Sequence, residues 1–366
     1  MKIGIIGTRG IPNHYGGFEQ FADSLSTFLV KKKHEVFVYN SSNHPFKEKI
    51  YKDVNIIHCL DPENKVGTIG QFVYDLNCIL DSRKRNYDII LQLGYTSSSI
   101  WSFLLPSKSI IITNMDGHEW NRSKYSSGTK RFLKYAEKLA VIKSNFLISD
   151  SLGIKNYLKN KYNKESKYIA YGSDIFDNPN EQILEKYTVK KFNYNMLIAR
   201  LEPENNIDVI LGGIDKSKDE TPFLVIGGYK LNKYGRSLKE KYKDNSQIKF
   251  LGGIYNMNEL NNLRYFSNIY FHGHSVGGTN PSLVEAMGSN AFIVAHKNKF
   301  NMSILQEDAY YFENNIDIQF FAEKLKKEKE KIKLKNNLKK ISLYYNYDNI
   351  NQLYLSFFNE CTSLFK

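Results

Sequence analysis

The sequence predicts an α/β protein built from two Rossmann-like domains, and three observations support this prediction. Short apolar runs alternate with longer amphipathic segments along almost the whole chain, which is the pattern of parallel strands covered by helices. A polar stretch at residues 172–191 interrupts this series once. At 366 residues, the chain is long enough for two cores of ordinary size.

The first series of elements occupies the first 170 residues. Strands are expected at residues 2–6, 35–39, 54–58, 89–93, 109–113, 146–149 and 168–170, where the runs are short and apolar. Helices are expected at residues 17–32, 68–83, 97–104, 129–143 and 151–160, where apolar residues recur at helical spacing. This largely alternating order is typical of a parallel sheet covered by helices.

A second series of the same kind follows the polar stretch. Strands are expected at residues 194–198, 222–226, 248–250, 269–272 and 292–295. Helices are expected at residues 207–216, 234–242, 257–266, 281–287 and 318–331. The two series predict an N-terminal domain at residues 1–172 and a C-terminal domain at residues 173–340, facing each other across a cleft at the carboxyl ends of their sheets.

The last 26 residues, 341–366, are predicted to form a helix that packs back on the N-terminal domain. This segment is too aromatic for a free tail, since it includes Tyr344, Tyr345, Tyr347, Tyr354, Phe357 and Phe358.

Composition restricts the classes of protein that fit. No apolar run reaches the length of a membrane-spanning helix, and the chain starts on a strand-like run without the features of a signal peptide. Three scattered cysteines indicate reduced thiols, so we expect a cytoplasmic protein. The net charge of +13 suits an anionic membrane, a phosphorylated substrate or nucleic acid, but no nucleic-acid-binding module is recognisable, so nucleic acid is not an expected partner.

Three glycines are spaced along the first predicted strand and the turn after it: Gly4 lies within the strand, and Gly7 and Gly10 follow it. Glycines at such a turn let the backbone approach a phosphate or a sugar closely. A dinucleotide-binding enzyme is disfavoured, because its fingerprint is GxGxxG with an acidic residue at the end of the second strand. Here the spacing is GxxGxxG and the second strand ends in Asn40 and Ser41.

A glycine pair, Gly16 and Gly17, opens the first predicted helix. The free N–H groups and the positive dipole at such a helix start favour a diphosphate or a carboxylate. The alternative is a flexible turn before an ordinary helix.

Three ionisable residues, Asp116, His118 and Glu119, follow the strand predicted at residues 109–113. Their place after a strand suits acid–base catalysis or the recognition of hydroxyl groups, so they are candidate catalytic residues on the acceptor side. For His118 alone, a structural role is the alternative.

In the second domain, Arg200 follows the first strand, where its guanidinium can stabilise a departing diphosphate. A glycine-rich turn precedes the helix predicted at residues 281–287, and its backbone donors are candidate ligands of the same group: Gly277, Gly278, Thr279, Asn280, Ser282 and Leu283. Glu285, one turn into that helix, is positioned to accept hydrogen bonds from ribose hydroxyls. His272 and His274 have no further Cys or His ligands nearby in the sequence, so no metal site is expected.

These motifs resemble those of the family 4 glycosyltransferases. Residues 199–205 resemble the family's GRLxxEK element, residues 250–253 its FxG turn, residues 282–287 the end of its paired-glutamate motif and residues 171–174 its PxGxD linker. The resemblance implies the GT-B fold, with an acceptor-side N-terminal domain and a nucleotide-sugar-binding C-terminal domain. It also implies retaining, metal-independent transfer that needs no cofactor besides the donor, which is a dTDP-, UDP- or GDP-linked sugar.

The front of the chain is similar to a narrower subgroup, the rhamnosyltransferase-like enzymes of bacterial capsule and O-antigen assembly. Residues 7–12, 15–19 and 116–120 carry this similarity. It implies transfer of a hexose, with rhamnose favoured, to a lipid-linked saccharide in cell-surface polysaccharide biosynthesis. A basic helix at residues 129–143 then suggests peripheral contact with the inner membrane face, or it is an ordinary helix that covers the sheet.

Two positions depart from the family pattern. Gly277 stands where the first glutamate of the paired motif is expected, and Asn205 stands where the family has a phosphate-binding lysine. Arg9 or Lys230 is a candidate for the missing positive charge. A nucleotide-sugar epimerase of similar fold and a non-catalytic nucleotide-sugar-binding protein are therefore the alternative functions.

Overall fold

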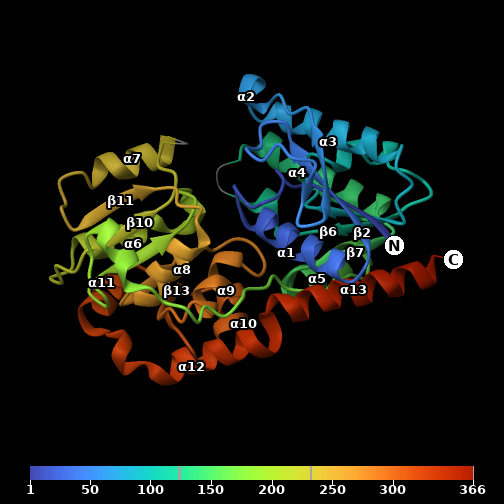
Figure 1. Ribbon diagram of the computed structural model, residues 1–366. Helices are drawn as coiled ribbons and strands as arrows, with labels where there is room; N and C mark the ends of the chain where they lie inside the picture. The colour runs from blue at the N-terminus through green and yellow to red at the C-terminus, as the bar shows by residue number, and fades with distance from the viewer. Residues whose placement is uncertain (123–124, 231–232, 366) are drawn as a thin grey trace. The chain divides into compact units, whose positions relative to one another are not determined.

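The computed structural model describes residues 1–122, 125–230 and 233–365, and it divides into two compact units (Figure 1). The first unit comprises Met1–Asn121, Tyr125–Tyr171 and Tyr347–Lys366. The second comprises Arg122–Lys124 and Gly172–Asn346. No helix among the described residues is long and apolar enough to cross a membrane.

The first unit is built on an eight-stranded sheet of order β3-β4-β2-β1-β5-β6-β7-β8. Its strands pair in parallel, except for β3, which is antiparallel to β4. The strands are β1 (Lys2–Ile6), β2 (Glu35–Ser41), β3 (Ile50–Tyr51), β4 (Val54–Cys59), β5 (Ile89–Leu93), β6 (Ile110–Asn114), β7 (Phe146–Ser149) and β8 (Lys167–Tyr168). The order reverses direction at β1, so a topological switch point lies between β1 and β5.

Helices cover this sheet because their apolar residues recur on one face. In α1, for example, Phe21, Leu25 and Leu29 are all buried. Ser126 and Ser151 cap the helices that follow them by accepting the N–H groups of Thr129 and Ile154. The helices are α1 (Gly17–Lys31), α2 (Glu63–Val66), α3 (Ile69–Ser82), η1 (Ser99–Leu104), η2 (Glu119–Asn121), α4 (Ser127–Lys143), α5 (Leu152–Tyr162) and α13 (Tyr347–Leu364).

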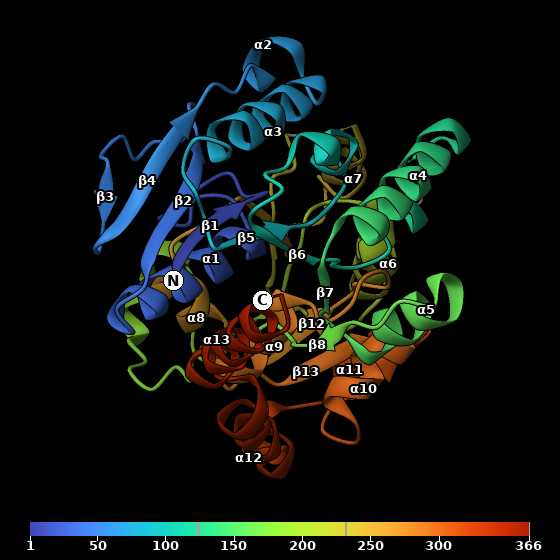
Figure 2. The ribbon, with the colours of Figure 1, turned by 90° about the vertical axis from the view of Figure 1, so that its right-hand side faces the viewer.

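The last helix, α13, belongs to the first unit although the second unit precedes it in the chain. It lies against α1 (Figures 1 and 2), where the rings of Tyr354 and Phe21 are 4.8 Å apart between centroids. The Asn114 side-chain amide donates a 2.9 Å hydrogen bond to the Tyr354 hydroxyl, and Asn351 bonds the Ser24 hydroxyl at the same distance. The helix therefore contacts the carboxyl end of β6.

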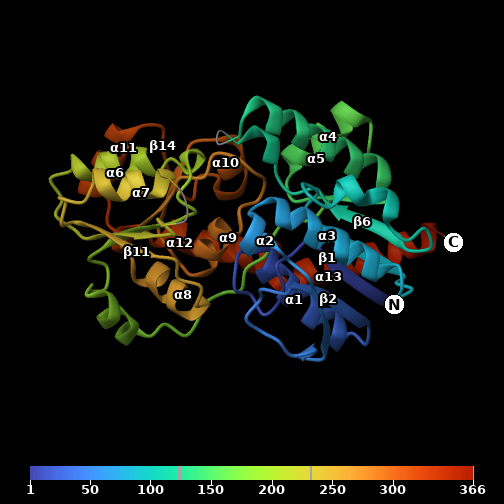
Figure 3. The same cartoon turned by 90° about the horizontal axis from the view of Figure 1, so that it is seen from above.

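The second unit contains a six-stranded parallel sheet of order β11-β10-β9-β12-β13-β14, and its switch point lies between β9 and β12. Its strands are β9 (Asn195–Ile198), β10 (Phe223–Ile226), β11 (Ile248–Gly252), β12 (Ile269–His272), β13 (Ile293–His296) and β14 (Tyr310–Phe312). Its helices are η3 (Glu181–Tyr187), η4 (Pro203–Asn205), α6 (Ile207–Asp215), α7 (Lys233–Lys241), α8 (Met257–Phe266), α9 (Pro281–Gly288), α10 (Lys299–Leu305), α11 (Asn315–Lys324), η5 (Lys327–Lys329), α12 (Lys331–Lys340) and η6 (Ile341–Tyr345). Helices α6 and α11 pack side by side (Figure 3).

The predicted α/β class with two parallel sheets is confirmed, but one predicted helix is wrong in its length. The helix expected at residues 318–331 ends at Lys324 as α11. Lys327 then turns inward and is 3% exposed, with its backbone N–H donating to the Asn268 side chain at 3.0 Å. A helix cannot continue through this point, because the N–H group bonds to a side chain of another element instead of to the preceding turn. The short strands β3 and β14 were not predicted, since runs of two or three residues carry almost no periodic signal.

Candidate functional site

Arg200 follows β9 at the switch point of the second sheet. It is exposed and lies two residues beyond the last residue of the strand. Its carbonyl oxygen accepts a 2.7 Å hydrogen bond from the side-chain amide of Asn205, which is buried. The predicted guanidinium therefore stands at the carboxyl end of the sheet, and Asn205 holds the turn that carries it.

The glycine-rich loop of residues 273–280 follows the neighbouring strand β12. The N–H and hydroxyl groups of Ser275 donate to the Glu204 carbonyl at 3.2 and 2.7 Å, so this loop lies against the turn that carries the arginine. Gly277 has a φ of +126°, which favours glycine, although a Cβ there would meet nothing within 4 Å. Among the described residues, no acceptor bonds the N–H groups of Gly277 and Gly278, so both remain available to an anion.

Helix α9 begins directly after this loop. The Asn280 side chain accepts the N–H of Ser282 at 2.9 Å, and the Asn280 carbonyl accepts the N–H of Leu283 at 3.0 Å. The Ser282 hydroxyl shares a 2.7 Å hydrogen bond with Tyr270. Leu283 and Thr279 are buried. These predicted residues therefore build the start of the helix and position the glycines before it.

Glu285 lies one turn into α9 and is partly buried. Its Oε2 accepts a 2.6 Å hydrogen bond from the guanidinium of Arg264, a residue of α8 that is 1% exposed. The carboxylate side chain keeps 13% of its surface exposed. The residue predicted to contact ribose is thus half of an ion pair whose cationic half is buried.

His272 and His274 stack on each other beside these residues, with ring centroids 4.5 Å apart and planes 20° apart. Burial lowers the pKa of His272 well below its usual value, and burial together with the charge of Arg200 lowers the pKa of His274 to about 3. Both rings are therefore neutral near pH 7. Asn298 and Asn301 each donate a 3.1 Å hydrogen bond to the His274 carbonyl, which ties the loop to α10.

The described residues contain no group of His, Cys, Asp and Glu suited to hold a metal ion.

In the first unit, the turn after β1 needs its glycines for close approach. Gly7 has a φ of +87°, and a Cβ on it would lie 2.4 Å from the Leu93 carbonyl oxygen. Gly10 has a φ of +121°, and a Cβ there would lie 2.4 Å from the Asn40 side chain. These glycines are explained by packing between β1 and its neighbours, so they need no ligand to account for them.

Helix α1 starts at Gly17 with Gly16 as its N-cap, which provides no side-chain cap. The buried carboxylate of Glu19 lies in this first turn, where its Oε1 accepts the backbone N–H of Arg9 at 2.7 Å. Burial raises the pKa of Glu19. The helix start predicted for the glycine pair is therefore present, with an acidic side chain beside it.

Arg9, one candidate for the positive charge that the family pattern lacks, pairs with two carboxylates of the first unit. Its guanidinium forms two hydrogen bonds with the Glu63 carboxylate and approaches Asp61 at 3.4 Å. These two carboxylates neutralise the charge of Arg9, which the sequence analysis named as a candidate to replace the family's phosphate-binding lysine. Lys230 is exposed.

The segment of residues 116–120 leaves the carboxyl end of β6 with Asp116 at a φ of +48°. Its Oδ1 accepts a hydrogen bond from Tyr171 at 3.3 Å. The Tyr171 ring also meets Phe18 edge-on at 6.2 Å, so this tyrosine brings the two predicted sites of the first unit together. Glu119 accepts a 2.8 Å hydrogen bond from Tyr125.

His118 stacks on Trp120, with ring centroids 5.2 Å apart, and meets Tyr157 edge-on at 4.3 Å. The Trp120 Nε1–H donates to the buried carboxylate of Glu137 at 2.8 Å. Burial by itself raises the pKa of Glu137, but hydrogen bonds from Tyr157, Tyr162 and Lys161 hold it below the usual value. An ionised carboxylate thus anchors the stacked rings of His118 and Trp120, which together form an aromatic platform.

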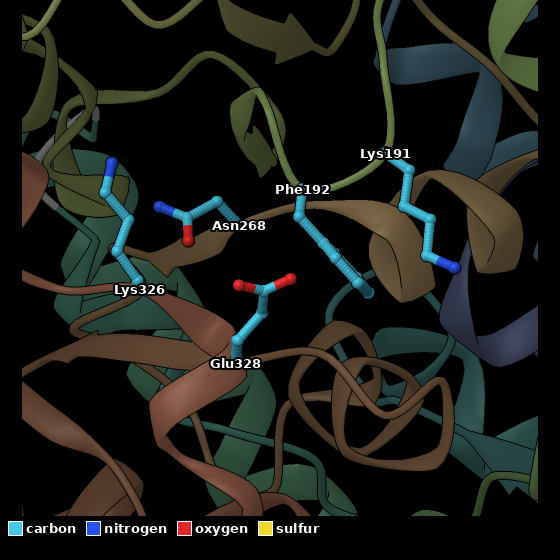
Figure 4. A pocket seen from close by; sticks show the side chains of 5 residues that line it. All are labelled: Lys191, Phe192, Asn268, Lys326 and Glu328. Atoms are coloured by element: carbon cyan, nitrogen blue, oxygen red, sulfur yellow. The ribbon is translucent and has the colours of Figure 1, made fainter.

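Two adjoining cavities of about 430 and 380 Å³ lie elsewhere in the second unit, and Figure 4 shows the larger one. Its lining includes Phe192 and Asn268, which precede β9 and β12. These cavities therefore lie at the amino ends of the parallel strands, whereas Arg200 and Gly277 lie at the carboxyl ends. They are separate from the candidate site.

Sequence reasoning missed several residues that hold the site, above all Arg264, Tyr171, Asn298 and Asn301. Arg264 did leave a signal, because it falls beside Leu263 on the apolar face of the helix predicted at residues 257–266. The others lie in polar or aromatic stretches whose partners are remote in sequence.

Comparison with known proteins agrees with this arrangement. Residues 1–174 match the family model described as domain of unknown function (DUF1972), and residues 180–342 match the model described as glycosyl transferases group 1. No curated protein matches the sequence significantly.

Solved structures resemble the whole chain. Sucrose-phosphate synthase from Thermosynechococcus elongatus has a TM-score of 0.78 at 14% identity, covering 98% of this chain and 99% of that one. HepE from Anabaena, solved in complex with UDP and glucose, has a TM-score of 0.74 at 15% identity, with the same coverage. The α,α-trehalose 6-phosphate synthase from Burkholderia multivorans has a TM-score of 0.70 at 11% identity, covering 100% of this chain and 99% of that one.

The fold is therefore that of the GT-B glycosyltransferases, as the sequence predicted. Residues 180–342 are a group 1 glycosyltransferase domain, a class also called family 4, and residues 1–174 are a DUF1972 domain.

Proposed function

We propose that this enzyme transfers a hexose, with rhamnose favoured, from a nucleoside diphosphate sugar to a lipid-linked saccharide during cell-surface polysaccharide synthesis. The observation that carries the proposal is that several groups suited to a nucleoside diphosphate lie together at one edge of the second sheet. The segment matching group 1 glycosyltransferases brings an exposed arginine, two open N–H groups and a carboxylate to the carboxyl ends of β9 and β12. Ligands of open α/β sheets bind at this edge, beside the switch point.

On the donor side, Arg200 and the N–H groups of Gly277 and Gly278 bind the diphosphate, and Glu285 binds the ribose. The main electrostatic task is to stabilise the negative charge that develops on the departing diphosphate, and a preorganised guanidinium performs it. The start of α1 at Gly16 and Gly17 is proposed as a further diphosphate ligand, through its helix dipole.

On the acceptor side, Asp116 and Glu119 accept hydrogen bonds from sugar hydroxyls, and His118 contacts the reacting hydroxyl. The platform of His118 and Trp120 offers an aromatic face to the apolar side of a sugar ring. Its anchor on Glu137 keeps this face in place before the acceptor arrives. Retention of configuration and independence from metal ions are proposed from the resemblance to family 4.

The lipid-linked acceptor gives the basic helix α4 a role. Its exposed side includes Arg131, Lys134 and Lys138 together with Phe132 and Tyr135. Cationic and aromatic side chains on one helix suit the surface of an anionic bilayer, so we propose peripheral contact with the inner membrane face.

A donor panel tests the proposal. The enzyme is incubated with dTDP-rhamnose, UDP-sugars and GDP-sugars, with and without lipid-linked glucose or galactose, and nucleotide release is measured. UDP-glucose belongs in the panel because HepE was solved in complex with it. Release of one nucleotide that depends on acceptor supports transfer and names the donor.

The alternatives predict different results in the same panel. Conversion of the donor sugar without acceptor would indicate an epimerase. Tight donor binding without release for any acceptor would indicate a binding protein and would implicate Gly277, which replaces the family glutamate.

A further inference from the structure

Arg264 is a charged residue in the core of the second unit. Its side chain is 1% exposed, yet one carboxylate, that of Glu285, pairs with it, at 2.6 Å. Its Nη1 donates to the Asn261 side chain at 3.1 Å, and no acceptor among the described residues bonds its Nε. Burying a guanidinium carries a large desolvation penalty, and full pairing with good geometry is needed to offset that penalty.

Stability alone is a poor explanation for this pair. Apolar residues of similar volume are often as stabilising as a buried ion pair, or more so. The pair is also incompletely satisfied, since the Nε remains without a partner and the carboxylate is partly exposed. A function of the exposed part of Glu285 accounts for its retention better than folding does.

The two oxygens of the Glu285 carboxylate have different surroundings. Arg264 occupies Oε2 of Glu285, and no described residue bonds Oε1. A charge-assisted hydrogen bond fixes the orientation of the carboxylate, so that Oε1 is an acceptor in a defined place. Fixing a group before the ligand arrives reduces the entropy lost on binding.

We propose that Arg264 is a positioning residue for the nucleotide: it holds Glu285 so that Oε1 accepts a hydrogen bond from a ribose hydroxyl of the donor. The inference rests on the proposed function, because it needs a nucleoside diphosphate at this site. The protein is therefore expected to bind a nucleotide that has this hydroxyl more tightly than one that lacks it, and this preference is expected to depend on Arg264.

The test compares nucleotides that differ by one hydroxyl. Calorimetry gives the affinities of UDP and GDP, of their 2′-deoxy and 3′-deoxy forms, and of dTDP and its 3′-deoxy form for the full-length protein. The hydroxyl ratio is the affinity of the parent nucleotide divided by that of its weaker deoxy form. Since a hydrogen bond to a charged group contributes about 1.5–3 kcal/mol, we expect a ratio of at least about 10 for the wild type.

Variants then separate positioning from folding. In Arg264→Met and in Glu285→Gln, the ratio should fall to about 3 or less, because the carboxylate is either released or lost. Arg264→Lys keeps the positive charge but not the planar fork, so its ratio should lie between the two. Lys186→Met is the matched control. It removes a 2.8 Å ion pair with Glu259, which lies on the same helix α8 as Arg264 but does not contact Glu285, so the ratio should stay at the wild-type value.

A purely structural role gives another pattern. It would lower the unfolding temperature of Arg264→Met and leave the ratio at the wild-type value, which would overturn the inference. If Arg264→Met does not fold, the ratio of Arg264→Lys decides, and a wild-type value overturns the inference in the same way.

Failure of the proposed function is distinguishable from failure of this inference. If the wild type binds none of the nucleotides, the proposed function falls and the inference falls with it. If the wild type binds and discriminates, but Arg264→Met discriminates equally well, the inference alone is wrong.

Discussion

At the scale of single residues, the three arginines of the candidate regions have different electrostatic surroundings. Arg9 pairs with two carboxylates and Arg264 with one, whereas no carboxylate of the described residues pairs with Arg200. An exposed guanidinium without a counter-ion keeps its charge available for an anionic ligand. The neutral state of His274 beside it agrees with this, because a charged ring there would be repelled by Arg200.

Replacing Arg200 by Ala should reduce kcat/KM at least about 100-fold, because stabilisation of the leaving group is lost. The unfolding temperature should change little, since the side chain is exposed. Steady-state kinetics and thermal unfolding measure the two effects. Arg236→Ala, an exposed arginine of α7, is the control and should keep full activity; unchanged kinetics in Arg200→Ala would contradict the placement of the donor.

Asp75 illustrates a buried acid whose energetics depend on pH. Burial raises the pKa of this residue of α3 to about 6, although Ser97 donates a hydrogen bond to it. Because the pKa in the folded state lies above the unfolded value of about 3.9, the protonated acid favours folding. This contribution is complete below about pH 4 and is lost as the pH rises through about 6.

Asp75→Asn should therefore increase the free energy of unfolding at pH 8, by about 1–2 kcal/mol, because it removes a buried charge. At pH 4 the difference between variant and wild type should be close to zero. Denaturant unfolding at the two pH values measures this. A variant that is less stable than the wild type at pH 8 would show that the carboxylate has a stabilising partner at that pH.

At the scale of elements, α13 is a helix that packs through an apolar interface containing a few polar contacts, among them that of Tyr354 with Asn114. Tyr354 is buried, and its hydroxyl accepts the Asn114 amide at the carboxyl end of β6. Asn114 in turn bonds the backbone N–H of Asp116 at 3.0 Å. The helix thus supports the strand end from which the proposed acceptor residues project.

Tyr354→Phe should lower the free energy of unfolding by about 1–2 kcal/mol, because the buried Asn114 amide loses its acceptor. Denaturant unfolding followed by fluorescence measures the change. Tyr344→Phe removes a hydroxyl from a tyrosine that is 63% exposed and serves as the control, with no expected change. Equal stability of both variants would mean that the Asn114 contact contributes nothing net.

At the scale of the whole molecule, binding to an anionic bilayer depends either on the net charge of +13 over the whole surface or on the charges of one helix. A general cationic surface binds an anionic bilayer through any face, whereas a docking helix combines charge with exposed aromatic rings. Helices α4 and α12 allow a direct comparison. Three exposed basic residues of each helix are compared: Arg131, Lys134 and Lys138 of α4, where Lys143 is also exposed, and Lys331, Lys335 and Lys339 of α12.

Replacing the three basic residues of α4 by Gln should weaken binding to anionic vesicles at least about tenfold, since each basic residue near such a surface contributes about 1 kcal/mol. The same change in α12 should leave most of the binding intact. Vesicle sedimentation at low and high salt measures both. Equal losses from the two triple variants would assign membrane binding to the total charge and remove α4 as a docking helix.

The sequence by itself determined the features that depend on local order. The alternation of apolar runs and amphipathic segments predicted the α/β class, because the side-chain periods of strands and helices are visible within ten residues. Motifs around Arg200 and Glu285 indicated the glycosyltransferase family, since each is a contiguous segment at a strand end. Short strands and the break at Lys327 escaped prediction, because the first lack a period and the second is imposed by a remote side chain.

The tertiary structure alone decided which side chains became partners. It pairs Arg9 with Glu63, Arg264 with Glu285 and Asn114 with Tyr354. These contacts join residues that are 54, 21 and 240 positions apart. Their charges and hydroxyls were readable in the sequence, but a polar group is satisfied by whatever the order of strands and the packing of helices bring within about 3 Å. Which cation remains open to a ligand is therefore a property of the folded chain.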